Sequence, residues 1–450
     1  MAYWNAFYDC GHYVLPYGKL TPDFITCEKK MPKQKKRWIV IGIVLVLVIA
    51  GLILAANWRT VGKQMANPLR GLLGVQAVAK IETVIFKVQD QIEQWKFDLG
   101  LAEAENPFGV AASPIEGSPT PASQVIPPTQ TESPTPTENP AEPQSTVDPE
   151  SLAEPTAIPP TLTVAPSPTP TGWVLANIEP FGDLQGEGIW QPYLYSLAGE
   201  VVAYRTFLQP DPERPYTLVA VVAFDLTKTD LRFVLGLEEP SKTGGPHGWG
   251  NIPVDDMQPG KLLAAFNGGF IAEHGGYGAM ADGVTALAGR SGLATLAIYN
   301  DNSVRIGEWG TDFYVDGDYR AWRQNALMIV HNGEINEKVY TGTEAEWGAN
   351  LDGATVTMRS AVGISEDNSV LYYFAGPSLS MPVLADAMVA AGAHNGMLLD
   401  INPTHAHFTA MRVVDGKLTA EALYPEEMDL WVDRYLHQWD QDFFYVIVKE

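Results

Sequence analysis

The sequence predicts one large α+β domain, rich in β-hairpins and with few helices, at residues 173–450. Short runs of β-branched and aromatic residues alternate there with turns of Asn, Asp and Gly, and one clear helical segment lies among them. The preceding residues 106–172 have a different composition, dominated by Pro, Thr and Ser. Upstream of this linker we expect one transmembrane helix and a helical stalk.

The domain contains four stretches with the pattern of a β-hairpin. They are residues 293–308, 326–335, 355–374 and 408–418, with turns at 300–302, 332–333, 366–368 and 415–416. Two further β-rich runs, 216–226 and 231–237, come before them. A helix is expected at 381–391, with Ser380 as its cap, Pro382 in its first turn and Gly392 at its end. An apolar strand, 397–401, follows directly.

Residues 38–57 are the expected transmembrane signal-anchor. They contain an unbroken apolar run of nineteen residues, 38–56, which as a helix reaches ~28 Å, about the hydrocarbon thickness of a bilayer. The tail 1–37 carries seven Lys and Arg against three Asp and Glu, whereas only Arg59 and Lys63 closely follow the run. This bias predicts a single-pass protein with a cytoplasmic N-terminus and an exported domain. A cleaved signal peptide and a buried helix are the alternatives, and the long leader favours the retained anchor.

The stalk is expected at 58–105. Apolar residues recur there at intervals of three and four, including Val78, Ile81, Val84, Ile85 and Val88, which indicates an amphipathic helix. Its expected role is a spacer or a self-associating coil, with a position on the bilayer surface as the alternative. The linker 106–172 is expected to be disordered, because it has too little apolar surface to offset the entropy cost of ordering.

Charge and cysteine content exclude some partners. The chain has a net charge of −24, and residues 173–450 hold sixteen Lys and Arg against thirty-seven Asp and Glu. We expect no nucleic acid partner, because binding a phosphate backbone needs a basic face. The two cysteines, Cys10 and Cys27, lie in the predicted cytoplasmic tail, so the exported part has no disulfide. With His12 they make only a loosely spaced, weak metal-binding pattern.

The first candidate site segment follows a buried-looking strand at 264–266. Asn267, Gly268, Gly269 and Phe270 come directly after it. Two successive glycines allow a positive φ and a close approach of the backbone to a ligand. The alternative is a tight turn in a long connection.

The second segment contains Arg359 in the middle of the apolar run 358–364. A buried arginine needs a partner. Either it forms an internal salt bridge, or its guanidinium holds a phosphate or carboxylate group of a substrate.

The third segment places Asp400 at the end of the strand 397–401, followed by Asn402, Thr404, His405 and His407. A carboxylate at a strand end suits catalysis or sugar binding. The two histidines have a metal-ligand spacing, but no third ligand is identifiable. We therefore expect no cofactor, with a divalent cation as the alternative to two solvated loop histidines.

Taken in order, these segments resemble the phosphodiester glycosidase family. The resemblance covers about 216–411 and rests on N-G-G-F at Asn267, R-S-A-V-G at Arg359, and the helix, strand and aspartate that end at Asp400. It implies a hydrolase that cleaves sugar-1-phosphodiester bonds, with Asn267, Arg359 and Asp400 as catalytic residues. Gly268, Gly269, Phe270, Asn402, Thr404 and His405 would bind the carbohydrate phosphodiester.

The sequence departs from the family pattern after the aspartate. The family has D-G-G-G-S, whereas this chain has D-I-N-P-T at 400–404. Ile401 adds a branched side chain and Pro403 has no N–H to offer a ligand. The usual Gly-Pro of the central hairpin is also absent. A non-catalytic glycan-binding or structural surface protein that uses the same pocket is therefore the alternative to an enzyme. The second carboxylate that most glycosidases need is not identifiable, and Glu273 and Asp282 are the nearest candidates.

Overall fold

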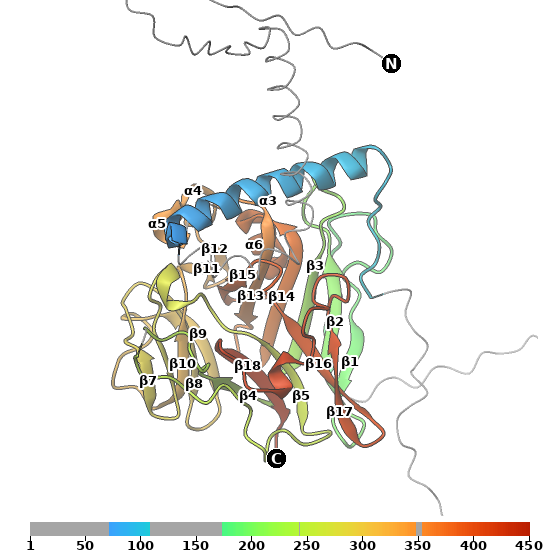
Figure 1. The fold of residues 1–450 in the computed structure, drawn as a ribbon. Coiled ribbons are helices and arrows are strands. Elements are labelled where there is room, and N and C mark those ends of the chain that lie inside the picture. The colour runs from blue at the N-terminus through green and yellow to red at the C-terminus, as the bar shows by residue number, and fades with distance from the viewer. Residues whose placement is uncertain (1–71, 109–172, 243, 348–352) are drawn as a thin grey trace, which may run out of the picture. The chain divides into compact units, whose positions relative to one another are not determined.

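The computed structural model describes residues 72–108, 173–242, 244–347 and 353–450 (Figure 1). The tail with Cys10 and Cys27, the apolar run 38–56 and most of the linker lie outside these residues. Among the described helices, none has the length and apolar character needed to cross a bilayer.

The largest sheet of the described domain has eight antiparallel strands. In spatial order they are β1 (Gln191–Tyr195), β2 (Val201–Leu208), β3 (Val219–Asp225), β14 (Val370–Leu379), β13 (Thr357–Ile364), β15 (Asn395–Ile401), β11 (Met328–His331) and β12 (Glu334–Ile335). The central strands β3 and β13 are buried along their whole length. Such strands have apolar residues on both faces, which agrees with their nearly continuous hydrophobic sequences.

Two five-stranded antiparallel sheets complete the β structure of the described residues. The first has the order β7 (Val284–Leu287), β6 (Ala279–Ala281), β10 (Tyr319–Gln324), β8 (Ala294–Tyr299) and β9 (Val304–Glu308). The second has the order β17 (Lys417–Ala422), β16 (Phe408–Val414), β5 (Leu262–Asn267), β18 (Phe443–Val448) and β4 (Thr229–Val234). A single buried cluster contains residues of all three sheets, such as Tyr373, Leu296 and Phe266. The three sheets therefore share one core.

Helices are few among the described residues, as expected from the sequence. They are α3 (Val75–Asp98), α4 (Lys338–Thr341), α5 (Glu344–Trp347) and α6 (Met381–Ala390), with the 3-10 turns η1 (Ala272–His274) and η2 (Arg434–Leu436). The predicted helix at 381–391 is confirmed. Ser380 stands at its N-cap position, but its side chain makes no capping hydrogen bond, contrary to the expectation.

All four predicted hairpins are present. They are β8–β9, β11–β12, β13–β14 and β16–β17, each with antiparallel register. Their turns contain the residues that accept a positive φ, such as Asn332 at 54° with Gly333 at 80°, and Asp415 at 51° with Gly416 at 74°. The turn residues therefore predicted correctly which strands pair as hairpins.

The helix α3 packs on the domain, a contact that the expectation of a stalk did not include. Its Val78 and Phe86 are buried. Arg214 donates from Nε and Nη2 to the two carboxylate oxygens of Asp90 at 2.8 and 2.9 Å. The structure places α3 beside the start of β13 and the end of β14 (Figure 1).

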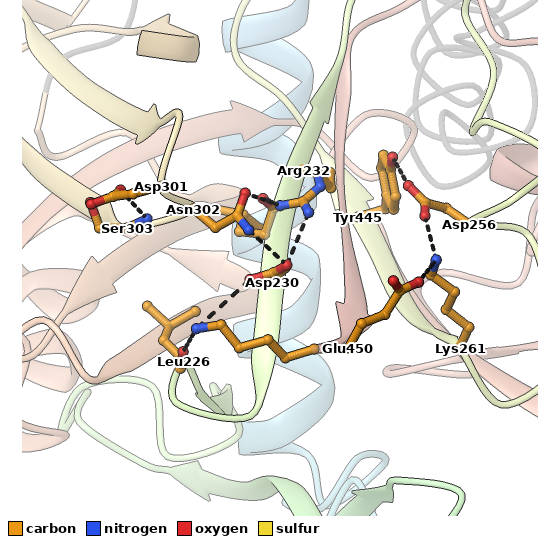
Figure 2. A network of polar contacts seen from close by, with 12 residues as sticks. Leu226, Asp230, Arg232, Asp256, Lys261, Asp301, Asn302, Ser303, Tyr445 and Glu450 are labelled. Atoms are coloured by element: carbon orange, nitrogen blue, oxygen red, sulfur yellow. Dashed lines mark hydrogen bonds and ion pairs between the residues drawn. The ribbon is translucent and has the colours of Figure 1, made fainter. Parts of the chain in front are cut away.

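A polar network joins three parts of the domain (Figure 2). Arg232 on β4 binds Asp230 at 2.9 Å and the side chain of Asn302, in the β8–β9 turn, at 3.1 Å. Next to it, Tyr445 on β18 donates to Asp256 at 2.7 Å. None of the predicted site residues belongs to this network, which connects a hairpin turn to the sheet of β4 and β18.

Candidate functional site

Phe266, the residue before Asn267, fixes the end of β5 in the core. Phe266 is fully buried. Its ring centroid lies 5.0 Å from that of Tyr373, 6.1 Å from that of Phe408 and 5.5 Å from that of Phe444. Aromatic pairs at these separations attract one another in addition to burying apolar area. The first candidate segment therefore starts from a well-packed point of the core.

The Asn267 side chain forms hydrogen bonds within the protein. Its Oδ1 accepts from the Tyr373 hydroxyl at 3.1 Å and from the His407 N–H at 2.9 Å. Its Nδ2 donates to the Gly268 carbonyl at 2.9 Å and to Ser360 Oγ at 3.0 Å. Because Asn267 is also 5% exposed, these contacts give it the role of positioning the loop that follows.

Ser360 connects Asn267 with Asp400. Its hydroxyl donates to the Asp400 carbonyl oxygen at 2.7 Å, while it accepts from Asn267. The Asp400 N–H in turn donates to the Gly268 carbonyl at 3.1 Å. The structure thus brings two of the three predicted catalytic residues together. The Asp400 carboxylate accepts from the Ile401 N–H at 2.8 Å and is 7% exposed.

The two glycines are required by the protein itself. Neither Gly268 nor Gly269 has a positive φ, so that expectation was wrong. A Cβ on Gly268 would lie 2.0 Å from the Asp442 carboxylate, and one on Gly269 would lie 3.0 Å from the Arg323 guanidinium. The close approach that the sequence predicted for a ligand is made instead by the side chains of Asp442 and Arg323.

Arg323 and Asp442 form a buried ion pair that sequence reasoning missed. Arg323 Nε lies 2.7 Å from Asp442 Oδ2, and the Gly269 N–H donates to the same oxygen at 3.3 Å. Arg323 also donates to the Phe270 carbonyl at 2.7 Å. The Phe270 ring is buried against Tyr277 with 6.0 Å between centroids, so the ring is part of the core, and its contact with a substrate stays a prediction.

Glu239 is a third residue that the sequence did not reveal. Its carboxylate accepts the Ala272 N–H at 2.8 Å, and its own N–H donates to the Asp440 carbonyl at 2.9 Å. Burial is the main cause that raises the pKa of Glu239 to about 7. The Asp442 charge raises this pKa further, whereas the Ala272 N–H and Arg323 lower it. A carboxylic acid with such a pKa exchanges protons near neutral pH.

The two sequence candidates for a second carboxylate lie in different parts of the fold. Glu273 is in η1 and exposed, close enough to Glu239 for its charge to raise the pKa of that group. Asp282 is in the β6–β7 turn with a φ of 48°, and its N–H donates to the Arg320 carbonyl at 3.2 Å. Glu239, which is half-buried and accepts the Ala272 N–H, is therefore preferred to both as the second carboxylate.

The segment after Asp400 shows how the chain accommodates its departure from the family pattern. Asn402 has a φ of 81°, a conformation that favours glycine and that Asn tolerates better than most residues. Its Oδ1 accepts from the N–H and the hydroxyl of Thr404, both at 3.3 Å. The Thr404 carbonyl accepts from Arg434 Nη1 at 3.0 Å. Asn402 and Thr404 thus bind each other and hold this turn.

The two histidines lie in different surroundings. His405 is half-buried, with Nδ1 3.1 Å from Gln441 Oε1. His407 is fully buried, with Nε2 2.9 Å from Thr409 Oγ1. Within the described part of the chain, no group of three or more His, Cys, Asp or Glu side chains is arranged to hold a metal ion.

Arg359 is fully buried in β13 and binds backbone carbonyls. Its Nε donates to Leu379 at 2.8 Å and its Nη2 to Thr355 at 2.6 Å. These bonds hold the end of β14 and the residues before β13 together. These contacts lie within the protein and stabilise its fold. The contact of Arg359 with a substrate anion stays a prediction.

A cavity of about 890 Å³ lies between α3, the segment that follows it and the domain. Its described lining includes Met358, Tyr424, Glu427 and Pro403, and Pro403 is its one residue from the 400–404 segment. Asn267, Asp400 and Glu239 are not part of that lining. The cavity therefore borders the candidate site at Pro403.

Comparison with protein families supports the resemblance inferred from the motifs. Residues 260–400 match the model of the phosphodiester glycosidase family. No curated protein matches the chain. The solved catalytic domain of zebrafish N-acetylglucosamine-1-phosphodiester alpha-N-acetylglucosaminidase, auto-inhibited by its pro-peptide, is similar at 15% identity and a TM-score of 0.36, over 58% of this chain and 88% of that one. A hypothetical protein from Synechocystis is similar at 8% identity and a TM-score of 0.31, over 58% and 64%.

The matched residues include every motif on which the resemblance was based. Asn267, Gly268, Gly269, Arg359 and Asp400 all lie within 260–400. Glu239 and Asp442 lie outside that range. Residues 260–400 of the chain therefore match the phosphodiester glycosidase family both in their motifs and in the family model.

Proposed function

We propose that this protein is a membrane-anchored, extracytoplasmic hydrolase that cleaves sugar-1-phosphodiester bonds in envelope glycans or glycoconjugates. The arrangement of Asp400 and Glu239 carries the proposal. The Asp400 N–H donates to the Gly268 carbonyl at 3.1 Å, and the Glu239 carboxylate accepts the Ala272 N–H at 2.8 Å. Asp400 and Glu239 thus contact the two ends of one short loop, Asp400 through its backbone and Glu239 through its carboxylate. Most glycosidases work with a pair of carboxylates.

In the proposed reaction, water attacks the anomeric carbon and the bond from this carbon to the bridging oxygen breaks. Glu239 accepts a proton from the water, and the phosphomonoester leaves with the bonding electrons. Asp400 stabilises the positive charge that develops on the sugar ring. One water is consumed, and the products are a free sugar and a phosphomonoester. A phosphate leaving group is a weak base, so the second carboxylate is more useful as a base than as an acid.

The environment of Glu239 suits a base. General base catalysis is most efficient when the pKa of the base lies near the working pH, and the pKa of Glu239 is raised to about 7. We propose Arg359 as the residue that holds the phosphodiester anion. His405, half-buried beside Gln441, is the second candidate for this contact.

Two substitutions in the full-length chain test the proposal. The assay substrate is the p-nitrophenyl phosphodiester of N-acetylglucosamine-1-phosphate, with free sugar as the measured product. We expect Asp400→Asn and Glu239→Gln each to lower kcat by ~10²–10⁴-fold, a typical contribution of acid–base groups. Glu238→Gln is the matched control, because this neighbouring residue is exposed. Near-normal turnover in Asp400→Asn or Glu239→Gln would remove that residue from the mechanism.

The 400–404 segment favours a second function, glycan binding without cleavage. Asn402 and Thr404 bind each other, and Pro403 has no N–H, so the backbone donors of the family's glycine run are reduced here. In that case wild type and Asp400→Asn would bind a glycan equally and neither would release sugar.

A further inference from the structure

Three tryptophans lie next to the candidate site. Trp249 is 81% exposed and Trp431 is 50% exposed. Trp439 is half-buried, with its ring centroid 6.4 Å from that of Trp431. Tryptophan is a large apolar side chain that proteins usually bury in most part. A group of three, two of them exposed, indicates a binding surface.

The backbone at Trp431 supports this reading. Its φ is 52°, in the left-handed region, where a bulky residue is a genuine outlier. Such a conformation persists only when its surroundings hold it, and it is common at ligand sites. Here Arg434 holds it, because both the Arg434 Nε and N–H donate to the Trp431 carbonyl, at 3.2 and 3.0 Å.

Arg434 also connects these tryptophans to the candidate site. Its Nη1 donates to the Thr404 carbonyl at 3.0 Å, and its guanidinium carbon lies 5.0 Å from the centre of the Trp439 ring. Arg434 is 3% exposed. One buried side chain therefore contacts both the segment after Asp400 and the aromatic surface.

A second connection runs through residues 437–442. The Gln438 side chain donates to the Trp249 carbonyl at 3.2 Å, and the Trp439 carbonyl accepts the Leu237 N–H at 3.1 Å. The next carbonyl, that of Asp440, accepts the Glu239 N–H at 2.9 Å. Trp249 and Glu239 are thus both hydrogen-bonded to the short segment that contains Trp439.

We propose that Trp249, Trp431 and Trp439 form a sugar subsite, on which a pyranose ring of the glycan stacks beside the bond to be cleaved. The apolar C–H face of a sugar ring matches the face of an indole, and its hydroxyls reach the polar groups around it. This inference rests on the proposed function. The neighbouring Asp433 and Asp440 are exposed, so the surface repels anionic lipid and accepts a neutral sugar.

Calorimetry on the full-length chain tests the subsite without turnover. The probes are N-acetylglucosamine, its β-1,4-linked tetramer, and the corresponding oligomers of glucose and mannose. We expect one of these sugars to bind, and Trp431→Ala and Trp249→Ala to weaken its binding at least tenfold, with Trp431→Tyr restoring most of it. Trp95→Ala is the matched control, because Trp95 is 57% exposed on α3. This variant is expected to leave sugar binding unchanged.

The outcomes separate the subsite from the enzyme. Sugar binding that depends on Trp431 in a protein without hydrolytic activity would support the subsite and contradict the proposed function. Hydrolysis with the same KM and kcat in Trp431→Ala, Trp249→Ala and wild type would contradict the subsite and leave the function intact. Absence of binding to every probe, or binding to phosphatidylcholine vesicles that Trp431→Ala abolishes, would also overturn the subsite.

Discussion

Arg323 and Asp442 form an ion pair with an Nε to Oδ2 distance of 2.7 Å, and their side chains are 0% and 1% exposed. The pair lies directly against Gly268 and Gly269. A buried ion pair contributes little net stability compared with apolar residues, but removal of one partner leaves an uncompensated charge. The pair thus specifies the shape of the loop that Asp400 and Glu239 contact.

Arg323→Met is expected to destabilise the domain strongly. Loss of the guanidinium leaves Asp442 buried without its partner, which typically costs about 3–5 kcal/mol. The free energy of unfolding from urea denaturation measures this effect. Glu93→Gln is the control, because its pair with Lys96 is 41% and 47% exposed, and such surface pairs contribute about 0–1 kcal/mol. A loss no larger than that of the control would contradict the structural role.

Asn267→Ala is expected to lower stability by about 1–3 kcal/mol, because the Tyr373 hydroxyl and the His407 N–H lose a buried acceptor. It should also lower kcat, since the loop would lose its fixed position. Asn300→Ala provides the comparison, because Asn300 is an exposed turn residue. If Asn267→Ala raised KM with kcat and stability unchanged, Asn267 would bind substrate directly and would not position the loop.

Glu239 predicts a specific pH dependence. Its pKa rises from 4.5 to about 7 on folding, so the folded state binds the proton more tightly than the unfolded state. This contribution to stability is fully present below the unfolded pKa and is lost as the pH rises through about 7. Between about pH 5 and pH 8, wild type should therefore lose more unfolding free energy than Glu239→Gln does. Equal losses would show that the pKa of Glu239 is not raised.

The topology expected from residues 1–63 is tested with protease on intact cells. The charge difference across the apolar run predicts that protease removes residues 173–450 and leaves the basic tail 1–37 protected. Lysed cells, in which both parts are digested, provide the control. A reporter fused after Glu450 that is active only in the cytoplasm would contradict the proposed location.

Local rules predicted much of the fold. Each hairpin was recognised from its turn, because residues such as Asn332 and Asn368 accept the positive φ that the turn needs. The first strands, β1 and β2, and the last, β18, were not predicted, although β18 has a strongly apolar sequence. Strand order also escaped prediction, because β3 and β4 follow each other in sequence but belong to different sheets.

The site was predicted in part, for a physical reason. Asn267 and Asp400 were found because each is a polar residue at the end of an apolar strand. Glu239 and Asp442 gave no such signal, since a lone acidic residue in a loop is usually solvated. Their roles arise from burial beside Arg323 and the Gly268–Gly269 backbone, which depends on tertiary contacts. Arg359 was recognised as buried, but its carbonyl partners Thr355 and Leu379 could not be identified from the sequence.

The position of bond cleavage tests the central claim most directly. The full-length protein is incubated with the p-nitrophenyl phosphodiester of N-acetylglucosamine-1-phosphate in water labelled with heavy oxygen, and the products are analysed by mass spectrometry. The account predicts label in the hydroxyl at the anomeric carbon of the sugar, together with unlabelled p-nitrophenyl phosphate. Label in the phosphate, either of p-nitrophenyl phosphate or of sugar-1-phosphate released together with p-nitrophenol, would contradict it.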